Sequence, residues 1–328
     1  MTGLLHSVRV LQRLKADDHP WMIDTPCMKP IRMDVERSNS TDHAGVSPRA
    51  TCWNLRTRKM GLGRLPLLMG IVNVTPDSFS DGDRFLAPEA AVQHGLALVE
   101  QGADILDVGG ESTRPYATPV DFETELGRVR GVLSQLCAQC EIPISIDTSK
   151  FEVAQLAIDC GAEIVNDVKG LEGDPRMARL VADSDAAVCV MHMHGTPSNM
   201  QDNPTYENVV DEIHLYLQQR RDALVKQGVR QDRICLDPGI GFGKTHQHNL
   251  TLLAHCHEFH DLGCPVLVGH SRKGFIGKVL ADKKADSTFG TVGVALSLAR
   301  QGVQIIRVHD VAAVRQALLL FEAAGGLD

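Results

Sequence analysis

Six polar side chains stand where short apolar runs end, and their types indicate two kinds of binding chemistry. Three carry carboxylate or amide oxygens and come directly after apolar residues inside a β pattern: Asp147, Asn166 and Asp237. Polar residues are ordinary at wet strand ends, but an isolated carboxylate beside buried residues is costly unless it is paired or bound to a ligand. Three facing acceptors suit a ligand that presents several N–H donors, such as a fused amino-pyrimidinone ring. The other three are basic and supply an end suited to an anion: Lys273, Arg307 and His309.

The stretch DPGIGFGKTH (237–246) is as rich in glycine as a phosphate-binding loop but lacks its spacing. In such a loop a glycine stands five residues before the glycine that precedes the Lys-Ser/Thr pair, so that backbone N–H groups surround the phosphates. Here that position is Pro238, which has no N–H to donate. The dinucleotide-binding pattern fails too, because Lys244 stands where its third glycine would be. We therefore expect a flexible turn after Asp237 that serves another purpose than nucleotide binding.

The composition argues against several classes of partner. With a net charge of −8 and no Lys/Arg-rich run, the 328-residue chain gives no sign of nucleic-acid binding. No apolar stretch approaches the roughly 20 residues needed to span a bilayer. The opening residues are a poor secretory signal, because His6, Arg9 and Arg13 interrupt them. The nine cysteines are scattered and odd in number, which is typical of a reducing compartment. We expect a cytoplasmic protein without membrane or nucleic-acid partners.

Two local patterns look like metal sites but have simpler interpretations. Cys137 and Cys140 form a C-x-x-C within a helical pattern, but no second pair accompanies them, so we interpret them as packing residues. Five histidines follow one another on a predicted helix with polar neighbours and without a carboxylate or cysteine at metal-site spacing, which favours a solvated face: His246, His248, His255, His257 and His260.

Composition changes near residue 60. Residues 1–60 carry a net positive charge, show no sustained period and contain both tryptophans, Trp21 and Trp53. We interpret them as an N-terminal extension with little structure of its own, followed by one domain over 61–328. Met60 is a possible alternative start, so this interpretation predicts that a chain starting there keeps full activity and that both indoles are exposed to water.

From residue 65 onward, short runs rich in Val and Ile alternate with longer helical patterns. Helical spacing is clear over 88–102 and 206–228, and several of the short runs are almost wholly apolar, as strands buried on both faces should be. The runs number eight: 67–74, 104–110, 143–149, 163–168, 186–193, 234–239, 265–271 and 304–310. Eight such units over about 250 residues predict an α/β fold of the (β/α)8 TIM barrel type. A doubly wound open sheet is the alternative, because the pattern cannot show closure.

In such barrels the chemistry lies at the carboxyl ends of the strands. Polar residues are found at or near every one of these ends: Asn73, Asp107, Asp147, Asn166 with Asp167, His192, Asp237, Lys273, and Arg307 with His309. Long segments rich in Gly, Pro and Ser follow the first two strands, over 75–85 and 111–121. We expect these two segments to be mobile covers over the mouth of the barrel.

At these residues the sequence resembles the dihydropteroate synthase family. The matching motifs appear in family order and cover 65–325: GIVNVTPDSFSDG (70–82), GGESTRP (109–115), ISIDTSK (144–150), IVNDV (164–168), MHMHGTP (191–197), LDPGIGFGK (236–244), SRKGFIG (271–277) and RVHDV (307–311). The resemblance implies a barrel, usually dimeric, that joins 6-hydroxymethyl-7,8-dihydropterin diphosphate to 4-aminobenzoate with the help of Mg²⁺. The products would be 7,8-dihydropteroate, on the folate pathway, and diphosphate.

The resemblance also implies roles for individual residues. The pterin ring would be held by Asp147, Asn166, Asp237 and Lys273, with Met191 against its face. Arg307 would stack on the ring and contact the diphosphate together with His309 and Asn73. Asn73 would also bind Mg²⁺ through its amide oxygen. Four residues would be catalytic: Asp147, Lys273, Arg307 and His309. The aminobenzoate site would be lined by Thr113, Arg114, Pro115, Phe242 and Ser271.

Four positions depart from the family pattern: Asp83, Tyr116, His194 and Gly274. They leave the pterin set intact and concern the loops and the aminobenzoate site. Two alternatives share the barrel. A pterin-binding methyltransferase would lack the SRK and RVHDV motifs. A non-catalytic pterin-binding relative should have lost residues such as Asn73, Arg114 or Lys273, which are all present here.

Overall fold

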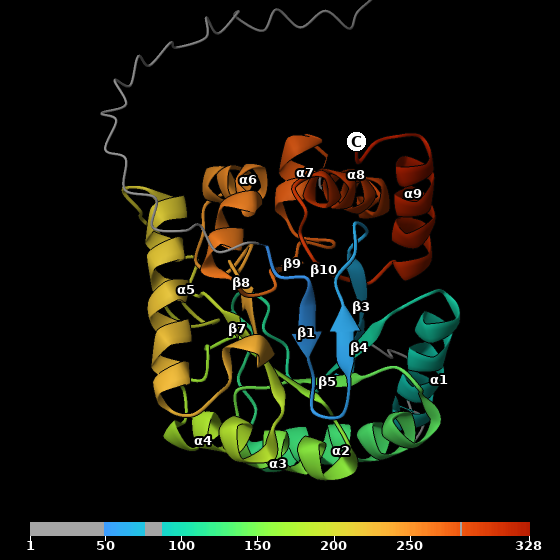
Figure 1. The fold of residues 1–328 in the computed structure, drawn as a ribbon, viewed down its shortest axis with the longest axis vertical. Helices are drawn as coiled ribbons and strands as arrows, with labels where there is room; N and C mark the ends of the chain where they lie inside the picture. The colour runs from blue at the N-terminus through green and yellow to red at the C-terminus, as the bar shows by residue number, and fades with distance from the viewer. Residues whose placement is uncertain (1–48, 76–86, 283) are drawn as a thin grey trace, which may run out of the picture. The chain divides into compact units, whose positions relative to one another are not determined.

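The computed structural model describes residues 49–75, 87–282 and 284–328, which belong to one unit of the chain that begins at Gly45. Its centre is a sheet of parallel strands, with helices between successive strands along the chain (Figure 1). The strands of this sheet are β3 (Leu67–Asn73), β4 (Ile105–Gly109), β5 (Ile144–Asp147), β6 (Ile164–Asp167), β7 (Ala187–Met191), β8 (Ile234–Asp237), β9 (Leu267–Gly269) and β10 (Ile305–Val308). Each of the eight apolar runs in the sequence therefore contains one strand.

The sheet closes into a barrel. The strand order is β8-β7-β6-β5-β4-β3-β10-β9, and the two ends meet through a parallel bridge between Leu236 and Val266. At this seam the N–H of Leu236 donates to the carbonyl of Pro265 at 2.8 Å. Closure confirms the predicted barrel and rules out the open sheet.

Helices flank the strands. They are α1 (Ala87–Glu100), α2 (Phe122–Gln139), α3 (Phe151–Cys160), α4 (Pro175–Ser184), α5 (Val209–Lys226), α6 (His246–Ala254), α7 (Phe275–Val279), α8 (Ser287–Arg300) and α9 (Val311–Ala323), with 3-10 turns η2 (Gln231–Arg233) and η3 (Cys256–Leu262). Local sequence explains several boundaries. Asp121 and Asp174 cap α2 and α4 by accepting backbone N–H bonds, and Gly161 ends α3 at a φ of 107°. None of the helices among the described residues is both long and apolar enough to cross a bilayer.

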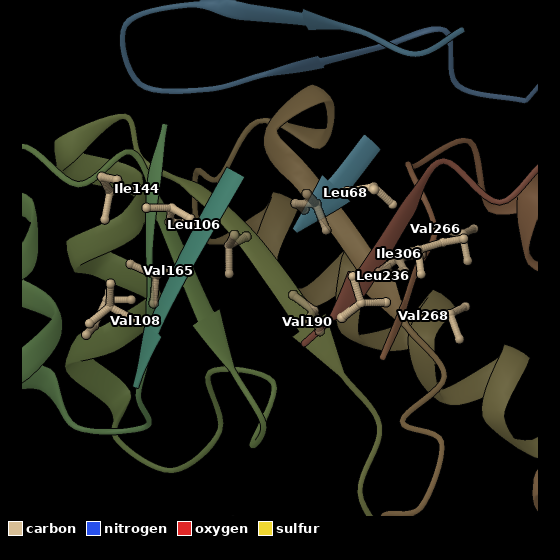
Figure 2. Packing of buried hydrophobic residues seen from close by; sticks show 14 of the residues in the cluster. Leu68, Leu106, Val108, Ile144, Val165, Val190, Leu236, Val266, Val268 and Ile306 are labelled. Atoms are coloured by element: carbon tan, nitrogen blue, oxygen red, sulfur yellow. The ribbon is translucent and has the colours of Figure 1, made fainter. Parts of the chain in front are cut away.

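Each strand separates two layers because its side chains alternate between the two faces. One set, including Leu106, Val165 and Leu236, packs with apolar residues of the helices (Figure 2). The other set points into the barrel. Toward the amino ends of the strands, where Met69 and Ile105 lie, this set is apolar and forms the lower inward layer of the barrel. Two residues farther along several strands, the inward positions become polar. This alternation is what gathers the candidate site residues.

Residues 49–61 are not an unstructured appendage, so the boundary expected at residue 60 is wrong for this part of the chain. β1 (Cys52–Asn54) and β2 (Lys59–Gly61) form an antiparallel hairpin, and Trp53 is completely buried with the lower inward layer of the barrel. The Trp53 indole N–H donates to the carbonyl of Arg233 at 3.0 Å, just before β8. The hairpin therefore covers the amino ends of the strands. Trp21 lies outside the described residues.

Candidate active site

A cavity of about 910 Å³ lies at the carboxyl ends of the barrel strands. Its walls come from strand ends and from the segments that follow them, as the sequence predicted. The predicted site residues that line it are Asn73, Thr113, Arg114, Pro115, Asp147, Phe242, Ser271, Lys273, Arg307 and His309. The barrel therefore brings together side chains that are more than 230 residues apart in the sequence, from Asn73 to His309.

Three predicted residues are not among the lining residues. Asn166, Met191 and Asp237 are buried, each on the inward face of its strand. Met191 pairs with Asp237 in the register of β7 and β8, and Asp147 pairs with Asn166 in that of β5 and β6. They therefore lie at the inner level of the barrel beside the lining residue Asp147.

A chain of charged and amide groups crosses the barrel at this level. The Arg307 guanidinium donates through Nε to Asp107 Oδ2 at 2.6 Å and through Nη2 to Asp147 Oδ2 at 2.7 Å. Asp107 Oδ2 also accepts from the Asn166 amide at 3.0 Å. The four residues come from β10, β4, β5 and β6, so they tie these strands together. From the sequence, Asp107 was only one polar residue at a strand end, and its role as an anchor for Arg307 was not predicted.

The burial of these groups changes their proton affinity. Burial raises the pKa of Asp147 to about 7, although the nearby Arg307 opposes the shift. Burial also raises the pKa of Asp237, and it lowers that of Lys273 to about 8. Burial alone would lower the pKa of Arg307, but Asp107 and Asp147 raise it above the ordinary value. At neutral pH the Arg307 guanidinium thus stays charged, and it lies in the same pocket as Asp147 and Lys273, whose pKa values are near 7 and 8. Clusters of shifted groups in a cleft are typical of functional sites.

Two basic side chains reach the cavity after strands β9 and β10. The Lys273 ammonium lies 4.5 Å from the centre of the Phe242 ring and donates to the Ile240 carbonyl. His309 contacts the Ser271 hydroxyl through Nδ1 at 3.0 Å, and its backbone N–H donates to the same oxygen at 3.2 Å. Burial and then Arg307 lower the pKa of His309 to about 4, so the imidazole is neutral at physiological pH.

The DPGIGFGK segment forms a tight turn whose backbone binds the Asp237 carboxylate. Asp237 Oδ1 accepts the N–H of Gly239 at 2.7 Å. Gly239 has a φ of 70°, and an added Cβ would lie 1.9 Å from the His192 carbonyl oxygen, so only glycine fits there. The turn expected after Asp237 is therefore present, but it is held by hydrogen bonds and close contacts instead of being flexible.

Lys244 fastens this turn and was missed as a functional candidate. It is buried, and its ammonium meets three acceptors, the Phe242 carbonyl at 2.9 Å, His192 Nδ1 at 3.0 Å and the His192 carbonyl at 3.3 Å. Burial lowers the pKa of Lys244 well below its ordinary value, and burial together with Lys244 lowers that of His192 to about 2. Lys244 therefore joins the turn after β8 to the end of β7.

The segment over 111–121 also contributes to the cavity wall. Tyr116 has a φ of 63°, the left-handed conformation that favours glycine, at a position where many family members have glycine. Its backbone N–H donates to the Pro197 carbonyl at 2.9 Å, and its hydroxyl donates to Asp202 at 3.1 Å. These contacts join the tip of the segment to the loop after β7. The other expected cover, 75–85, lies almost wholly outside the described residues, as does the departure at Asp83.

Among the other departures, His194 packs its ring edge-on against Tyr206 at 5.9 Å, and an added Cβ at Gly274 would meet open space. The two patterns that look like metal sites contribute no metal centre in the described ranges, where no group of three or more His, Cys, Asp or Glu side chains could hold an ion. Cys137 and Cys140 pack against the core instead, as expected.

Comparisons with known proteins agree with one another. Residues 69–309 match the model of the pterin binding enzyme family. The dihydropteroate synthase of Neisseria meningitidis serogroup C is 43% identical over 277 residues, which cover 83% of this chain and 97% of that protein. The solved structure of Xanthomonas albilineans dihydropteroate synthase with 4-aminobenzoic acid is 44% identical, with a TM-score of 0.78, and covers 85% of this chain and 100% of that one. The X. albilineans enzyme in complex with 7,8-dihydropteroate is 41% identical, with a TM-score of 0.76 over 84% and 100% of the two chains.

Proposed function

Because the chain belongs to the dihydropteroate synthases of the pterin-binding enzyme family, we propose that its cavity joins 6-hydroxymethyl-7,8-dihydropterin diphosphate to 4-aminobenzoate. The products are 7,8-dihydropteroate, for tetrahydrofolate biosynthesis, and diphosphate, so the enzyme is a transferase. One observation carries the assignment to this cavity. The acceptor Asp147 and the cations Lys273 and Arg307 line one cavity, and the buried acceptors Asn166 and Asp237 lie at the carboxyl ends of β6 and β8.

The pterin ring binds at the inner level of the cavity. Its N–H donors face the oxygens of Asp147, Asn166 and Asp237, Lys273 contacts the opposite edge of the ring, and Met191 packs against its face. The burial of the three acceptors supports this proposal, because buried acceptors bind a ligand's N–H groups more strongly than exposed ones do.

The diphosphate lies at the basic end of the cavity, with Arg307 stacked on the ring and His309 and Asn73 toward the phosphates. Asn73 ends β3 and lines the cavity. Mg²⁺ prefers oxygen ligands and usually keeps several waters and substrate phosphates, so the protein needs to supply few of its ligands. The residues therefore fit a Mg²⁺ ion held by Asn73 and by the diphosphate. When bound, this ion supplies positive charge that stabilises the departing diphosphate.

The reaction breaks the bond between the pterin methylene carbon and the diphosphate oxygen. Both electrons leave with the diphosphate, whose developing charge Arg307 stabilises. The resulting pterin cation is stabilised by the Asp147 carboxylate. The aromatic amine of 4-aminobenzoate then forms the new carbon–nitrogen bond, and its proton passes to the released diphosphate. A closed cavity excludes water, which would otherwise capture the cation.

The second substrate occupies the outer part of the cavity. Its wall consists of Thr113, Arg114 and Pro115 on one side and of Phe242 and Ser271 on the other, all of which line the cavity. The Phe242 ring supplies an apolar face for the benzene ring. Arg114 supplies a cation for an anionic aromatic acid.

A coupled assay with both substrates, with and without Mg²⁺, tests the reaction. Formation of 7,8-dihydropteroate from the purified full chain is the expected result, and methyl transfer to a corrinoid instead would contradict the proposal. The site is tested by titration calorimetry with the pterin diphosphate. Asp237→Ala should weaken binding at least about tenfold, because losing a hydrogen bond to a charged acceptor costs about 1.5–3 kcal/mol. Asp237→Asn, which keeps an oxygen for the Gly239 N–H, should weaken it less.

The chain is also proposed to act as a homodimer in the cytoplasm. Large apolar side chains are exposed on the last three helices: Val279 on α7, Phe289 on α8, and Leu319 and Leu320 on α9. Exposed apolar side chains of this size favour a contact with another protein surface. All cysteines of the described residues are free thiols, which supports a reducing compartment.

A further inference from the structure

A cluster of three charged residues lies outside the proposed pterin site, at the base of the segment over 111–121. The Lys150 ammonium bridges Glu111 Oε2 at 2.6 Å and Glu125 Oε2 at 2.5 Å. Glu125 is completely buried, while the side chains of Glu111 and Lys150 are about one-fifth exposed. Lys150 does not line the cavity, but Glu111 does.

The cluster joins three elements at the mouth of the barrel. Lys150 follows β5 three residues after Asp147, Glu111 follows β4, and Glu125 lies in the first turn of α2. Glu111 also closes the segment on itself, since its Oε1 accepts the N–H of Val120 at 3.0 Å. The Lys150 ammonium therefore fixes three parts of the chain. Through Glu111 it holds the start and the end of the 111–121 segment, and through Glu125 it holds the first turn of α2.

The chain cannot relax inward at this base. At Gly110 an added Cβ would lie 2.7 Å from Val129 Cγ1 and 2.9 Å from Glu125 Cγ, so the backbone already touches α2. The Gly110 carbonyl also accepts from Arg128 at 2.7 Å. Without Lys150, the carboxylates of Glu111 and Glu125 would repel each other, and Glu111 could only move outward. The residues directly after it, Thr113, Arg114 and Pro115, would move with it.

We infer that Lys150 is a positioning residue for the second substrate, which holds Thr113, Arg114 and Pro115 in the cavity wall through its bridge to Glu111. This inference rests on the proposed function, because it assumes that this wall contacts 4-aminobenzoate. It assigns no contact between Lys150 and either substrate. The pterin acceptors Asn166 and Asp237 belong to other strands, and Asp147, which precedes Lys150 by three residues, is held by Arg307 instead of by this bridge.

Steady-state kinetics with each substrate varied in turn tests the inference. Lys150→Met should raise the KM for 4-aminobenzoate about fivefold or more, while the KM for the pterin diphosphate stays within about twofold. Lys150→Arg keeps the charge and should restore most of the loss. Glu111→Gln weakens the bridge but leaves Lys150 and Glu125 paired, so it should raise the KM for 4-aminobenzoate in the same way but less. This variant replaces Lys150→Met as the test if Lys150→Met does not fold.

Arg315→Met is the matched control for a general loss of stability. Arg315 is partly buried and bridges Asp104, just before the start of β4 and so at the opposite end of that strand. The control should lower the melting temperature without separating the two KM values. Equal changes in both KM values for Lys150→Met, or none, would show that the cluster is only structural. A wild-type chain without any dihydropteroate formation would instead overturn the proposed function, so the two failures are distinguishable.

Discussion

Arg307 lies between two carboxylates, and this position determines what its removal should do. A basic residue at a strand end that acts on developing charge would be expected to affect turnover with little change in melting temperature. In the structure its guanidinium is the partner of both Asp107, which is completely buried, and Asp147. Removing one partner of a buried ion pair leaves an uncompensated charge.

Arg307→Ala should therefore reduce both turnover and stability. We expect a loss of more than about tenfold in kcat, and about 3–5 kcal/mol in the free energy of unfolding, as is usual when a buried pair is broken. Chemical denaturation measures the second quantity. The double variant Arg307→Met with Asp107→Asn should recover much of the stability but none of the activity. Recovery of activity in the double variant would show that Arg307 acts only as a structural anchor.

The pH dependence should reflect Asp147 and Lys273. Asp147, whose pKa burial raises to about 7, loses its charge as the pH falls below that value. Lys273, whose pKa burial lowers to about 8, loses its charge as the pH rises above that value. Both are charged together only between the two, so kcat/KM for the pterin diphosphate, which reports the free enzyme, should follow a narrow bell.

Lys273→Arg is the control for the alkaline limb. Arginine stays protonated throughout the accessible range, so the decrease above about pH 8 should disappear while the acid limb remains. A wild-type profile that is flat from about pH 6 to 9 would contradict the assignment of both groups to the pterin site.

At the scale of elements, the hairpin β1–β2 shows that part of the N-terminal segment is folded against the barrel. Besides Trp53, the hairpin is tied to the barrel by Asn54, which donates to Asp232 at 2.8 Å, and by Arg58, whose guanidinium pairs with Glu163 at 2.7 Å. The hairpin thus seals the apolar lower layer from water. A chain that starts at Met60 would lose β1 and expose this layer.

Truncation at Met60 should accordingly destabilise the enzyme, contrary to the expectation from sequence. Trp53→Ala alone should cost about 3–5 kcal/mol of unfolding free energy, as for other large buried side chains. A chain starting at residue 49 keeps the whole hairpin and is the matched control, which should retain activity. In a Trp21→Phe background, the emission of Trp53 should be blue-shifted. An emission maximum typical of water would mean that the hairpin does not cover the barrel in solution.

At the scale of the whole molecule, α7, α8 and α9 expose large apolar side chains to solvent. Phe289 is 79% exposed and Leu320 is 71% exposed. If they form the dimer interface, Phe289→Asp should produce monomers in analytical ultracentrifugation, because an unpaired charge opposes burial. Leu215→Asp on α5, also a well-exposed apolar position, should leave the dimer intact. A wild-type chain that sediments as a monomer at micromolar concentration would refute the dimer.

The sequence by itself determined the alternation of strands and helices and most of the candidate site. Strands buried on both faces must be apolar, so polar residues at their ends are conspicuous, as Asn166 and Asp237 were. The same local pattern could identify the turn after Asp237, since the positions of its glycines follow from backbone sterics.

Only the tertiary structure decided features that depend on distant partners. Closure requires the seam between Leu236 and Val266, which no local pattern contains. The anchoring of Arg307 by Asp107 joins residues 200 positions apart, and the bridge through Lys150 joins three elements. Trp53 belongs to a segment without a sustained period, and it is buried only because the barrel offers an apolar end to cover. Periodicity reports which face of an element is buried, whereas the identity of the partner is set by packing between elements that the sequence keeps apart.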